Sequence, residues 1–323
     1  MAAGNAPERM QAAAFDEFGG PEVITPRILP VPQIADDEVL LKVWSAGVGV
    51  WDAFEREGTL VPEGADFPIV PGAEAAGTVA AVGRQVTNVA VGDLVYVYGY
   101  RRPKGGFYAE YAATKAQYVA KLPAGVSAEH AGAMPTDALT ALSGLDVLGL
   151  PAGAWVLIFG ASGGQGHLGV QLAKRQGLKV IAVASGAEGV ALVTRLGADL
   201  SLEGHGDVTA ALARIRDVAP EGVDGVLAMA GGETLDRFAE ALRDGGVLAY
   251  PNGVQPAPRE RPAVTVRAYN GETGPERLQR LNELIEAGPF EVHVAEKFPL
   301  GRAAEAHRRL QTSYPGKLLL TVS

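Results

Sequence analysis

Apolar residues in the central part of the chain form strand-length runs that alternate with stretches of helical periodicity. The runs predict strands at 155–159, 180–184, 226–229, 247–250 and 264–268. The stretches between and after them predict helices at 166–176, 187–196, 208–218 and 235–243. Continuous apolar strands separated by amphipathic helices are typical of a parallel sheet covered by helices on both faces. We therefore expect an α/β, doubly wound domain in this part of the chain.

The flanking regions follow a different pattern. Before residue 124, short β-rich runs at 11–15, 39–43 and 94–98 are separated by glycine-containing turns, which indicates a barrel-like or sandwich-like module. Ser127 is a candidate helix N-cap ahead of a helix at 136–148. The end of the chain predicts helices at 276–287 and 303–312 and a strand at 317–322. This arrangement predicts a discontinuous first domain, 1–124 and 271–323, around a second domain at 125–270.

The sharpest local signal is the loop Gly-Ala-Ser-Gly-Gly-Gln-Gly at 160–166, between a predicted strand and a predicted helix. Glycines permit a tight turn and let a pyrophosphate approach the backbone, and the helix N-terminus offers free N–H groups to the phosphates. The spacing departs from the plainest dinucleotide fingerprint, and a ligand-free turn is the alternative. The order strand, loop, helix, strand favours a dinucleotide site. Its candidate cofactor contacts are Ala161, Ser162, Gly163, Gly164, Gln165 and Gly166.

The strand after this loop leads into Ser185, about 20 residues on, where the ribose-binding side chain of such a site is expected. An NAD-preferring site carries a carboxylate at this position, whereas Ser185 leaves room and a donor for a 2′-phosphate. The nearby Glu188 is better explained as a helix-start charge. NADPH is therefore the expected cofactor. Three basic residues are candidates for the charge on the phosphate, and the sequence does not choose among them: Lys174, Arg175 and Arg195.

Composition limits the partners and the compartment. The net charge of −9 over 323 residues argues against a nucleic-acid partner, since a phosphate backbone requires a basic surface. The one basic cluster, Arg101, Arg102 and Lys104, is expected to be a solvated loop. The absence of cysteine removes disulfides, thiol nucleophiles and thiolate metal ligands. No signal peptide or membrane-length apolar run is readable, so we expect a cytoplasmic protein without membrane partners.

Several motifs follow one another along nearly the whole chain. They are 46–48 with Asp52 and Arg56, the block 71–77, the block 105–111, the glycine loop, and Gly245-Gly246. Together they resemble the medium-chain dehydrogenase/reductase superfamily, in its zinc-free, quinone oxidoreductase (zeta-crystallin-like) branch. The resemblance implies a GroES-like β-rich catalytic domain, built from both chain ends, around a Rossmann domain. It also implies a homodimer and an acceptor in the cleft between the domains.

The same resemblance assigns further cofactor contacts by motif position. They are Thr140 beside the nicotinamide, Asn252 and Gly253 in the cofactor cleft, and Ala268, Tyr269 and Asn270 near the carboxamide. Zinc-dependent relatives carry a cysteine at the position of Ala46 and a histidine near Ala73, and both ligands are missing here. The five histidines are scattered without a pair at ligand spacing, so no metal is expected.

Without a metal, reduction of an activated acceptor is more natural than oxidation of an alcohol. We expect hydride transfer from NADPH to a quinone. An enoyl or 2-alkenal reductase is the alternative enzyme, and a non-catalytic NADPH-binding protein is the third possibility. The acceptor is a small-molecule quinone or enone in the first two cases.

The acceptor pocket is expected to be apolar. Relatives usually carry Asn-Pro where this chain has Gly49-Val50, and a tyrosine where it has Phe54, so Trp51 and Phe54 should form the wall. The developing oxyanion needs a hydroxyl or N–H donor. The candidate catalytic residues near that space are Asp52, Thr136 and Tyr269, and Asp52 could equally be a capping residue.

Overall fold

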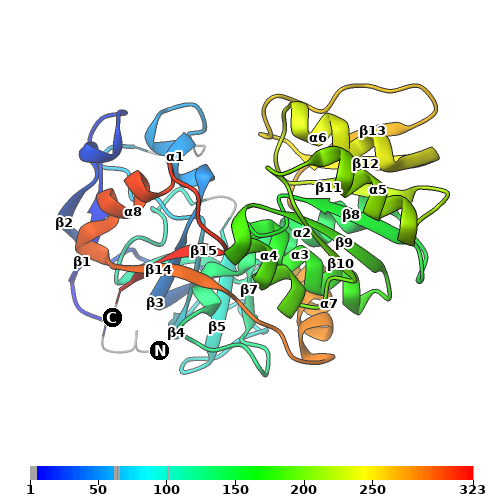
Figure 1. Ribbon diagram of the computed structural model, residues 1–323. Helices are drawn as coiled ribbons and strands as arrows, with labels where there is room; N and C mark the ends of the chain where they lie inside the picture. Colours follow the sequence, from blue (N-terminus) through cyan, green and yellow to red (C-terminus); the bar gives the residue numbers. More distant parts are fainter. Residues whose placement is uncertain (1–5, 62–63, 65, 100–101, 323) are drawn as a thin grey trace.

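The apolar runs at the centre of the chain form a six-stranded parallel sheet, the basis of the lobe on the right in Figure 1. The computed structural model describes residues 6–61, 64, 66–99 and 102–322. In spatial order the strands are β10 (Leu200–Glu203), β9 (Lys179–Ala184), β8 (Trp155–Phe159), β11 (Val223–Ala228), β12 (Leu242–Pro251) and β13 (Thr265–Tyr269). Counted along the chain within this sheet, the order is 3-2-1-4-5-6, that of a doubly wound dinucleotide-binding fold.

Helices cover both faces of this sheet. One face carries α2 (Pro135–Leu148), α3 (Gly164–Arg175), α4 (Gly186–Arg195) and α7 (Pro275–Glu286), and the other carries α5 (Val208–Val218) and α6 (Glu233–Phe238). Within β8, Val156 and Ile158 belong to the first of these cores, and Leu157 and Phe159 to the second. This burial on both sides explains why the strands are apolar without alternation. The predicted α/β, Rossmann-type domain is confirmed.

The other lobe is built on a mainly antiparallel seven-stranded sheet, which combines strands from before and after the parallel-sheet lobe in the chain (Figure 1). Its strands are β14 (Val294–Pro299), β15 (Lys317–Thr321), β3 (Glu38–Val48), β4 (Glu74–Val82), β5 (Leu94–Tyr98) and β7 (Val119–Lys121), with β6 (Tyr111–Lys115) paired to β3. A hairpin of β1 (Arg9–Ala14) and β2 (Thr25–Pro30) and the short helices α1 (Val50–Arg56) and α8 (Ala303–Arg309) complete it. This is the expected GroES-like, β-rich domain.

Several local predictions needed correction. The helix expected at 235–243 ends at Phe238, because Leu242 already belongs to β12 and pairs with Val223. Ser127 does not cap α2; its Oγ accepts a hydrogen bond from the backbone N–H of His130 in a turn that precedes the helix by several residues. Helix α1 was not predicted, nor were the strands β2, β4, β6, β7, β10 and β14. The domain limits at 124/125 and 270/271 stay a prediction.

The two lobes also meet away from the cleft, through α7. Tyr96 of β5 donates a hydrogen bond from its hydroxyl to Asn282 Oδ1 of α7 over 2.8 Å. Leu278, Leu281 and Ile285 of α7 share a core with α2 and α3. Thus α7 belongs to the packing of the parallel-sheet lobe while it holds the edge of the other sheet. Among the helices of the described ranges, none is long and apolar enough to cross a lipid bilayer.

We expect Tyr96→Phe to lower the free energy of unfolding by about 1 kcal/mol, the usual net value of a buried hydrogen bond. The ring would stay in place, so the loss would report the link between β5 and α7. Urea denaturation of wild type and variant measures it. An unchanged midpoint would mean that this hydrogen bond does not contribute to holding the lobes together.

Candidate active site

The glycine loop joins β8 to α3 as expected. Gly160 has a φ of +76°, a conformation that side chains disfavour. A Cβ on Gly166 would lie 2.2 Å from the carbonyl oxygen of Gly160, so the helix packs against the loop too closely for any side chain. Gly163 differs, because a Cβ there would meet only the Gly160 oxygen, at 3.5 Å. Its hydrogen faces open space, where a ligand can approach the backbone.

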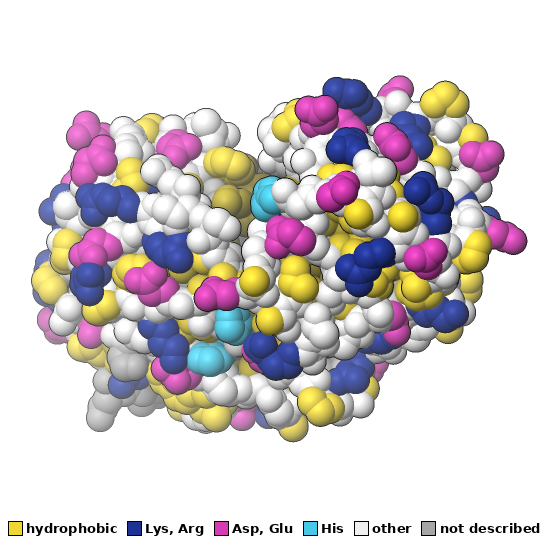
Figure 2. All heavy atoms as spheres, viewed as in Figure 1, with side chains coloured by type: hydrophobic (Ala, Val, Ile, Leu, Met, Phe, Trp, Pro, Cys, Tyr) yellow, Lys and Arg dark blue, Asp and Glu magenta, His cyan; other side chains and the backbone are white. Residues whose placement is uncertain are grey.

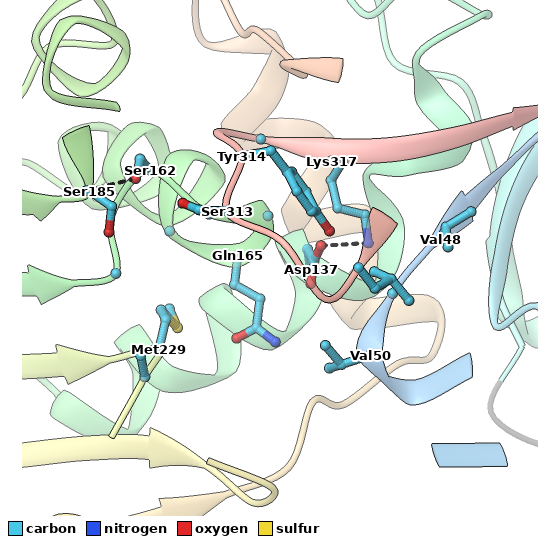
Figure 3. A pocket seen from close by; sticks show the side chains of 18 of the residues that line it. Val48, Val50, Asp137, Ser162, Gln165, Ser185, Met229, Ser313, Tyr314 and Lys317 are labelled. Carbon is cyan, nitrogen blue, oxygen red and sulfur yellow. Dashed lines mark hydrogen bonds and ion pairs between the residues drawn. The ribbon is translucent and has the colours of Figure 1, made fainter. Parts of the chain in front are cut away.

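That space is a cavity of about 320 Å³ between the lobes, which we call the first cavity. The parallel-sheet lobe contributes the glycine loop, Ser185 and Met229, and the other lobe contributes Val48, Val50, Tyr314 and Lys317 (Figure 3). It lies at the carboxyl ends of β8 and β11, where the strand order reverses and dinucleotides bind in such folds. Figure 2 shows the cleft from outside as a notch between the lobes with hydrophobic side chains at its bottom.

The cavity fits a dinucleotide. Gln165, in the first turn of α3, extends between Met229 and Val50 (Figure 3), and its Oε1 is buried with no hydrogen-bond partner among the described residues. Buried acceptors without a partner are costly, so they usually have a ligand or water as partner. Together with the open face of Gly163, this oxygen marks a place where polar ligand atoms belong.

Ser185 lies at the end of β9, on the rim of the first cavity. Its backbone N–H donates to Ser162 Oγ over 3.2 Å, which ties the end of β9 to the glycine loop (Figure 3). Its own Oγ lies 3.2 Å from Nε2 of His205, in the turn after β10. His205 was not among the expected residues, because only the pairing of β10 with β9 brings it to Ser185.

The three basic residues considered for the phosphate lie elsewhere. Lys174 pairs with Asp199, Arg195 pairs with Glu291, and Arg175 donates to the carbonyl oxygen of Pro289. All three line a separate cavity on the outside of the parallel-sheet lobe. That cavity does not include Ser185, so these side chains are not at its hydroxyl.

A second cavity, of about 360 Å³, adjoins the first and shares Trp51 with it. It brings together most of the residues expected at the nicotinamide and the acceptor, which lie far apart in the chain. Its lining includes Trp51, Glu55, Leu60, Val61, Ala73, Tyr98, Arg102, Thr136, Thr140, Pro251, Asn252, Tyr269 and Asn270. Apolar side chains form much of the wall, and the polar groups come from both lobes.

Five expected residues do not line either cavity: Phe54, Ala161, Gly253, Ala268 and Asp52. Phe54 packs edge-on against Trp51, with ring centroids 5.9 Å apart, and so supports the wall rather than forming it. Ala161 is fully buried beneath the loop, and Ala268 lies exposed on the edge strand β13. Gly253, with a φ of +105°, lies against Trp51, where a Cβ would come within 3.0 Å of the indole.

Asp52 is a capping residue. Its Oδ2 accepts from the backbone N–H of Gly49 over 2.9 Å, at the start of α1, and its Oδ1 accepts from the N–H of Ala73 over 3.1 Å. Burial raises the pKa of Asp52, with the Arg102 charge opposing the rise. The linings of the two cavities do not include Asp52. Asp52 supports the wall of the second cavity from outside the cavity. This agrees with the alternative that it is a capping residue.

Thr136 and Tyr269 differ in how their hydroxyls are directed. Both line the second cavity, and both hydroxyls are buried with no hydrogen-bond partner among the described residues. The Tyr269 hydroxyl lies against α2, where a Cβ on Gly144 would come within 2.4 Å of it. The backbone N–H of Thr136 donates to Glu74 Oε2 over 2.8 Å, which fixes the start of α2 beside β4. Because the Tyr269 hydroxyl lies against α2, Thr136 is the remaining candidate for a donor to an acceptor.

Comparison with known proteins agrees with this geometry. Residues 35–124 match the family model of the alcohol dehydrogenase GroES-like domain, and residues 196–320 match that of the zinc-binding dehydrogenases. The chain is 32% identical to the NADPH-dependent alkenal/one oxidoreductase of Arabidopsis thaliana, over 97% of this chain and 80% of that protein. It is 30% identical to human quinone oxidoreductase, over 96% and 97% of the two chains. The chain belongs to the medium-chain dehydrogenase/reductase superfamily, in its quinone oxidoreductase branch.

A solved member of this superfamily shares the fold. The structure of a mycobacterial protein complexed with NADPH superposes with a TM-score of 0.81, at 30% identity, covering 97% of this chain and all of the other. The name of the second family model includes zinc. In this oxidoreductase, however, alanines stand at the two positions where zinc ligands would be expected, Ala46 in β3 and Ala73 in the wall of the second cavity. Within the described ranges, no group of three or more His, Asp or Glu side chains could hold a metal ion.

Sequence reasoning missed a buried charge cluster beside the first cavity. Lys317 Nζ, on β15, lies 2.8 Å from Glu74 Oε1. It also lies 2.7 Å from Asp137 Oδ2 (Figure 3). The three side chains are 3–9% exposed. Burial raises the pKa of Glu74 to about 7; Asp137 adds to the rise, and Lys317 opposes it. One lysine cannot compensate two carboxylates fully, so the cluster holds a proton more tightly than the unfolded chain does.

We expect this proton to make stability fall with pH. Glu74 has an ordinary pKa of 4.5 and a folded-state pKa of about 7. The stabilisation of the folded state that comes from its bound proton is therefore fully present below pH 4.5 and is lost as the pH rises through about 7. Relative to Glu74→Gln, wild type should lose about 2–3 kcal/mol of unfolding free energy across this window. Urea denaturation at several pH values measures the difference. The exposed Glu22→Gln is the control and should follow wild type; a Glu74→Gln profile that also follows wild type would contradict the assignment.

Proposed function

We propose that this chain is a zinc-independent, NADPH-dependent oxidoreductase that reduces quinones and enones. The observation that carries the proposal is the pair of adjoining cavities. The first is built on the dinucleotide loop, and the second, reached past Trp51, has an apolar wall with buried hydroxyl groups and the exposed amides of Asn252 and Asn270. The names of the relatives, an NADPH-dependent alkenal/one oxidoreductase and a quinone oxidoreductase, agree with both parts of the proposal.

NADPH would be held along the whole cleft. The backbone of the glycine loop and the N-terminus of α3 would receive the pyrophosphate. Ser185 and His205 would meet the 2′-phosphate, and Thr140, Asn252 and Asn270 would face the nicotinamide. When bound, the cofactor supplies a hydride from C4 of the nicotinamide.

The protein's own groups then have defined tasks in the second cavity. Trp51, Leu60 and Val61 give the cavity an apolar wall, and an acceptor packed against them would displace water, which would strengthen polar interactions inside. The Thr136 hydroxyl, which lacks a partner among the described residues, would donate to the acceptor oxygen as negative charge develops there. Solvent supplies the remaining proton.

The finer assignments belong to the same proposal. A zinc-free protein agrees with the alanines at positions 46 and 73. A homodimer agrees with the place of β13 at the edge of the six-stranded sheet, since an edge strand can pair with another chain. A cytoplasmic location, domain limits of 1–124 with 271–323 and 125–270, and the absence of nucleic-acid and membrane partners are expectations of the same kind. A purely structural, non-catalytic role is the alternative that turnover would eliminate.

An NADPH-consumption screen tests the activity directly. We expect oxidation of NADPH with a quinone and with a small enone, at rates unchanged by a metal chelator, and no useful oxidation of ethanol or benzyl alcohol. The physical reason is the lack of a Lewis acid to activate an alcohol. No turnover with either acceptor, or about one zinc per chain together with loss of activity in chelator, would refute the proposal.

Cofactor choice is tested at Ser185. We expect Ser185→Asp to lower kcat/KM for NADPH by about ten- to a hundredfold, because a carboxylate would repel the 2′-phosphate. Use of NADH should fall far less or improve. The matched variant His205→Gln should lower efficiency with NADPH and leave NADH unchanged. A wild type that already prefers NADH would mean that Ser185 and His205 do not bind the 2′-phosphate. An unchanged ratio of kcat/KM for NADPH to kcat/KM for NADH in both variants would mean the same.

A further inference from the structure

The wall of the second cavity contains a buried ion pair that the reaction described above does not use. Arg102 Nη2 lies 2.8 Å from Glu55 Oε2, and the two side chains are 8% and 3% exposed. Arg102 was expected in a solvated basic loop, and that prediction is wrong for it; Lys104 pairs with Glu38, and Arg101 lies outside the described residues. Burying such a pair costs desolvation energy that their attraction often fails to repay.

The Arg102 guanidinium has more donors than its protein partners use. Its Nη1 donates to the carbonyl oxygen of Gly72 over 2.5 Å, and its Nη2 donates to Glu55. Its Nε is buried with no hydrogen-bond partner among the described residues. A guanidinium carries five N–H donors in a rigid plane, so contacts with the described residues account for two of them. The group is fixed in position and still able to donate.

Arg102 and the nicotinamide contacts come from different lobes. Thr140, Asn252 and Asn270 belong to the parallel-sheet lobe, whereas Arg102 and Glu55 belong to the other, and all five line the same cavity. The segment 72–74 connects the two walls, since Gly72 accepts from Arg102 and Glu74 accepts from the N–H of Thr136. An acceptor ring in this cavity would lie between the two walls.

We propose that Arg102 binds a second carbonyl oxygen of the acceptor, remote from the atom that takes the hydride, and thereby makes quinones better acceptors than alkenals with a single carbonyl. This inference rests on the proposed function. A quinone takes one hydride from NADPH and one proton from solvent, its two carbonyls become hydroxyls, and NADPH becomes NADP⁺. The entering electron pair spreads onto the ring oxygens, so a fixed guanidinium donor stabilises the charge as it forms.

Glu55 restricts the kind of group that this site accepts. Its carboxylate lies against the guanidinium and balances the charge of Arg102. A substrate carboxylate would gain the attraction of Arg102 and meet the repulsion of Glu55, both in a buried site. A neutral carbonyl oxygen takes the hydrogen bond without that repulsion. The pair therefore favours neutral dicarbonyl acceptors over anionic ones.

The test replaces the pair by apolar side chains of similar size, Glu55→Leu with Arg102→Met, because removing one partner alone would leave a buried unpaired charge. We expect kcat/KM for 1,4-naphthoquinone to fall by about ten- to a hundredfold, the usual value of a hydrogen bond to a charged donor. For 2-cyclohexenone, which has one oxygen, we expect a change below about threefold. Thermal unfolding of the double variant checks that it folds.

Arg84→Met is the matched control, because Arg84 forms an exposed ion pair with Asp36 outside both cavities; it should leave both activities unchanged. A folded double variant that loses the two activities equally, or loses neither, overturns the role of Arg102 as the anchor of a second oxygen. Reduction of neither acceptor by wild type is a different result. It would refute the proposed function itself.

Discussion

The buried lysine of the last strand fixes how the two lobes meet, and both cavities depend on it. Lys317 of β15 contacts Glu74 of β4 in its own sheet and Asp137 of α2 in the other lobe. The preceding residue, Gly316, donates from its N–H to the carbonyl oxygen of Ser162 over 2.7 Å, within the glycine loop. Because buried charges are costly unless paired, any sliding of the lobes would expose or separate these groups. The cleft therefore has a defined width where the dinucleotide would bind.

The cluster also explains how distant segments form one site. Glu74 accepts a hydrogen bond from Thr136 at the start of α2, and Asp52 holds the neighbouring Ala73 from behind. Ala73 itself lines the second cavity, as does Thr136. Several short hydrogen bonds thus set the position of Thr136 relative to Trp51, although the two residues come from different lobes. Such rigid support is what a site needs to hold an acceptor against a cofactor.

Charge is distributed unevenly between the two cavities. The first has backbone N–H groups at a helix N-terminus in its lining, as suits a phosphate-bearing ligand, while its lysine, Lys317, is already paired with two carboxylates. The second is mostly apolar, and its charged pair, Arg102 and Glu55, is balanced. This contrast matches one charged and one neutral ligand. It also explains why an acidic protein can still bind a dinucleotide, since local groups outweigh the net charge at such short range.

The sequence alone determined the parallel-sheet domain, the glycine loop, the place of Ser185 at the end of a strand and the resemblance to the superfamily. These features rest on local patterns: apolar periodicity, and glycines where backbone geometry requires them. The tertiary structure decided the rest. His205 reaches Ser185 only because β10 pairs with β9, and Lys317 reaches Asp137 only because β15 lies beside the other lobe. Arg102 is buried where the fold brings it to Glu55 and to the carbonyl oxygen of Gly72. A charge in a short basic run has the sequence pattern of a solvated one, and only long-range packing decides which partners it meets.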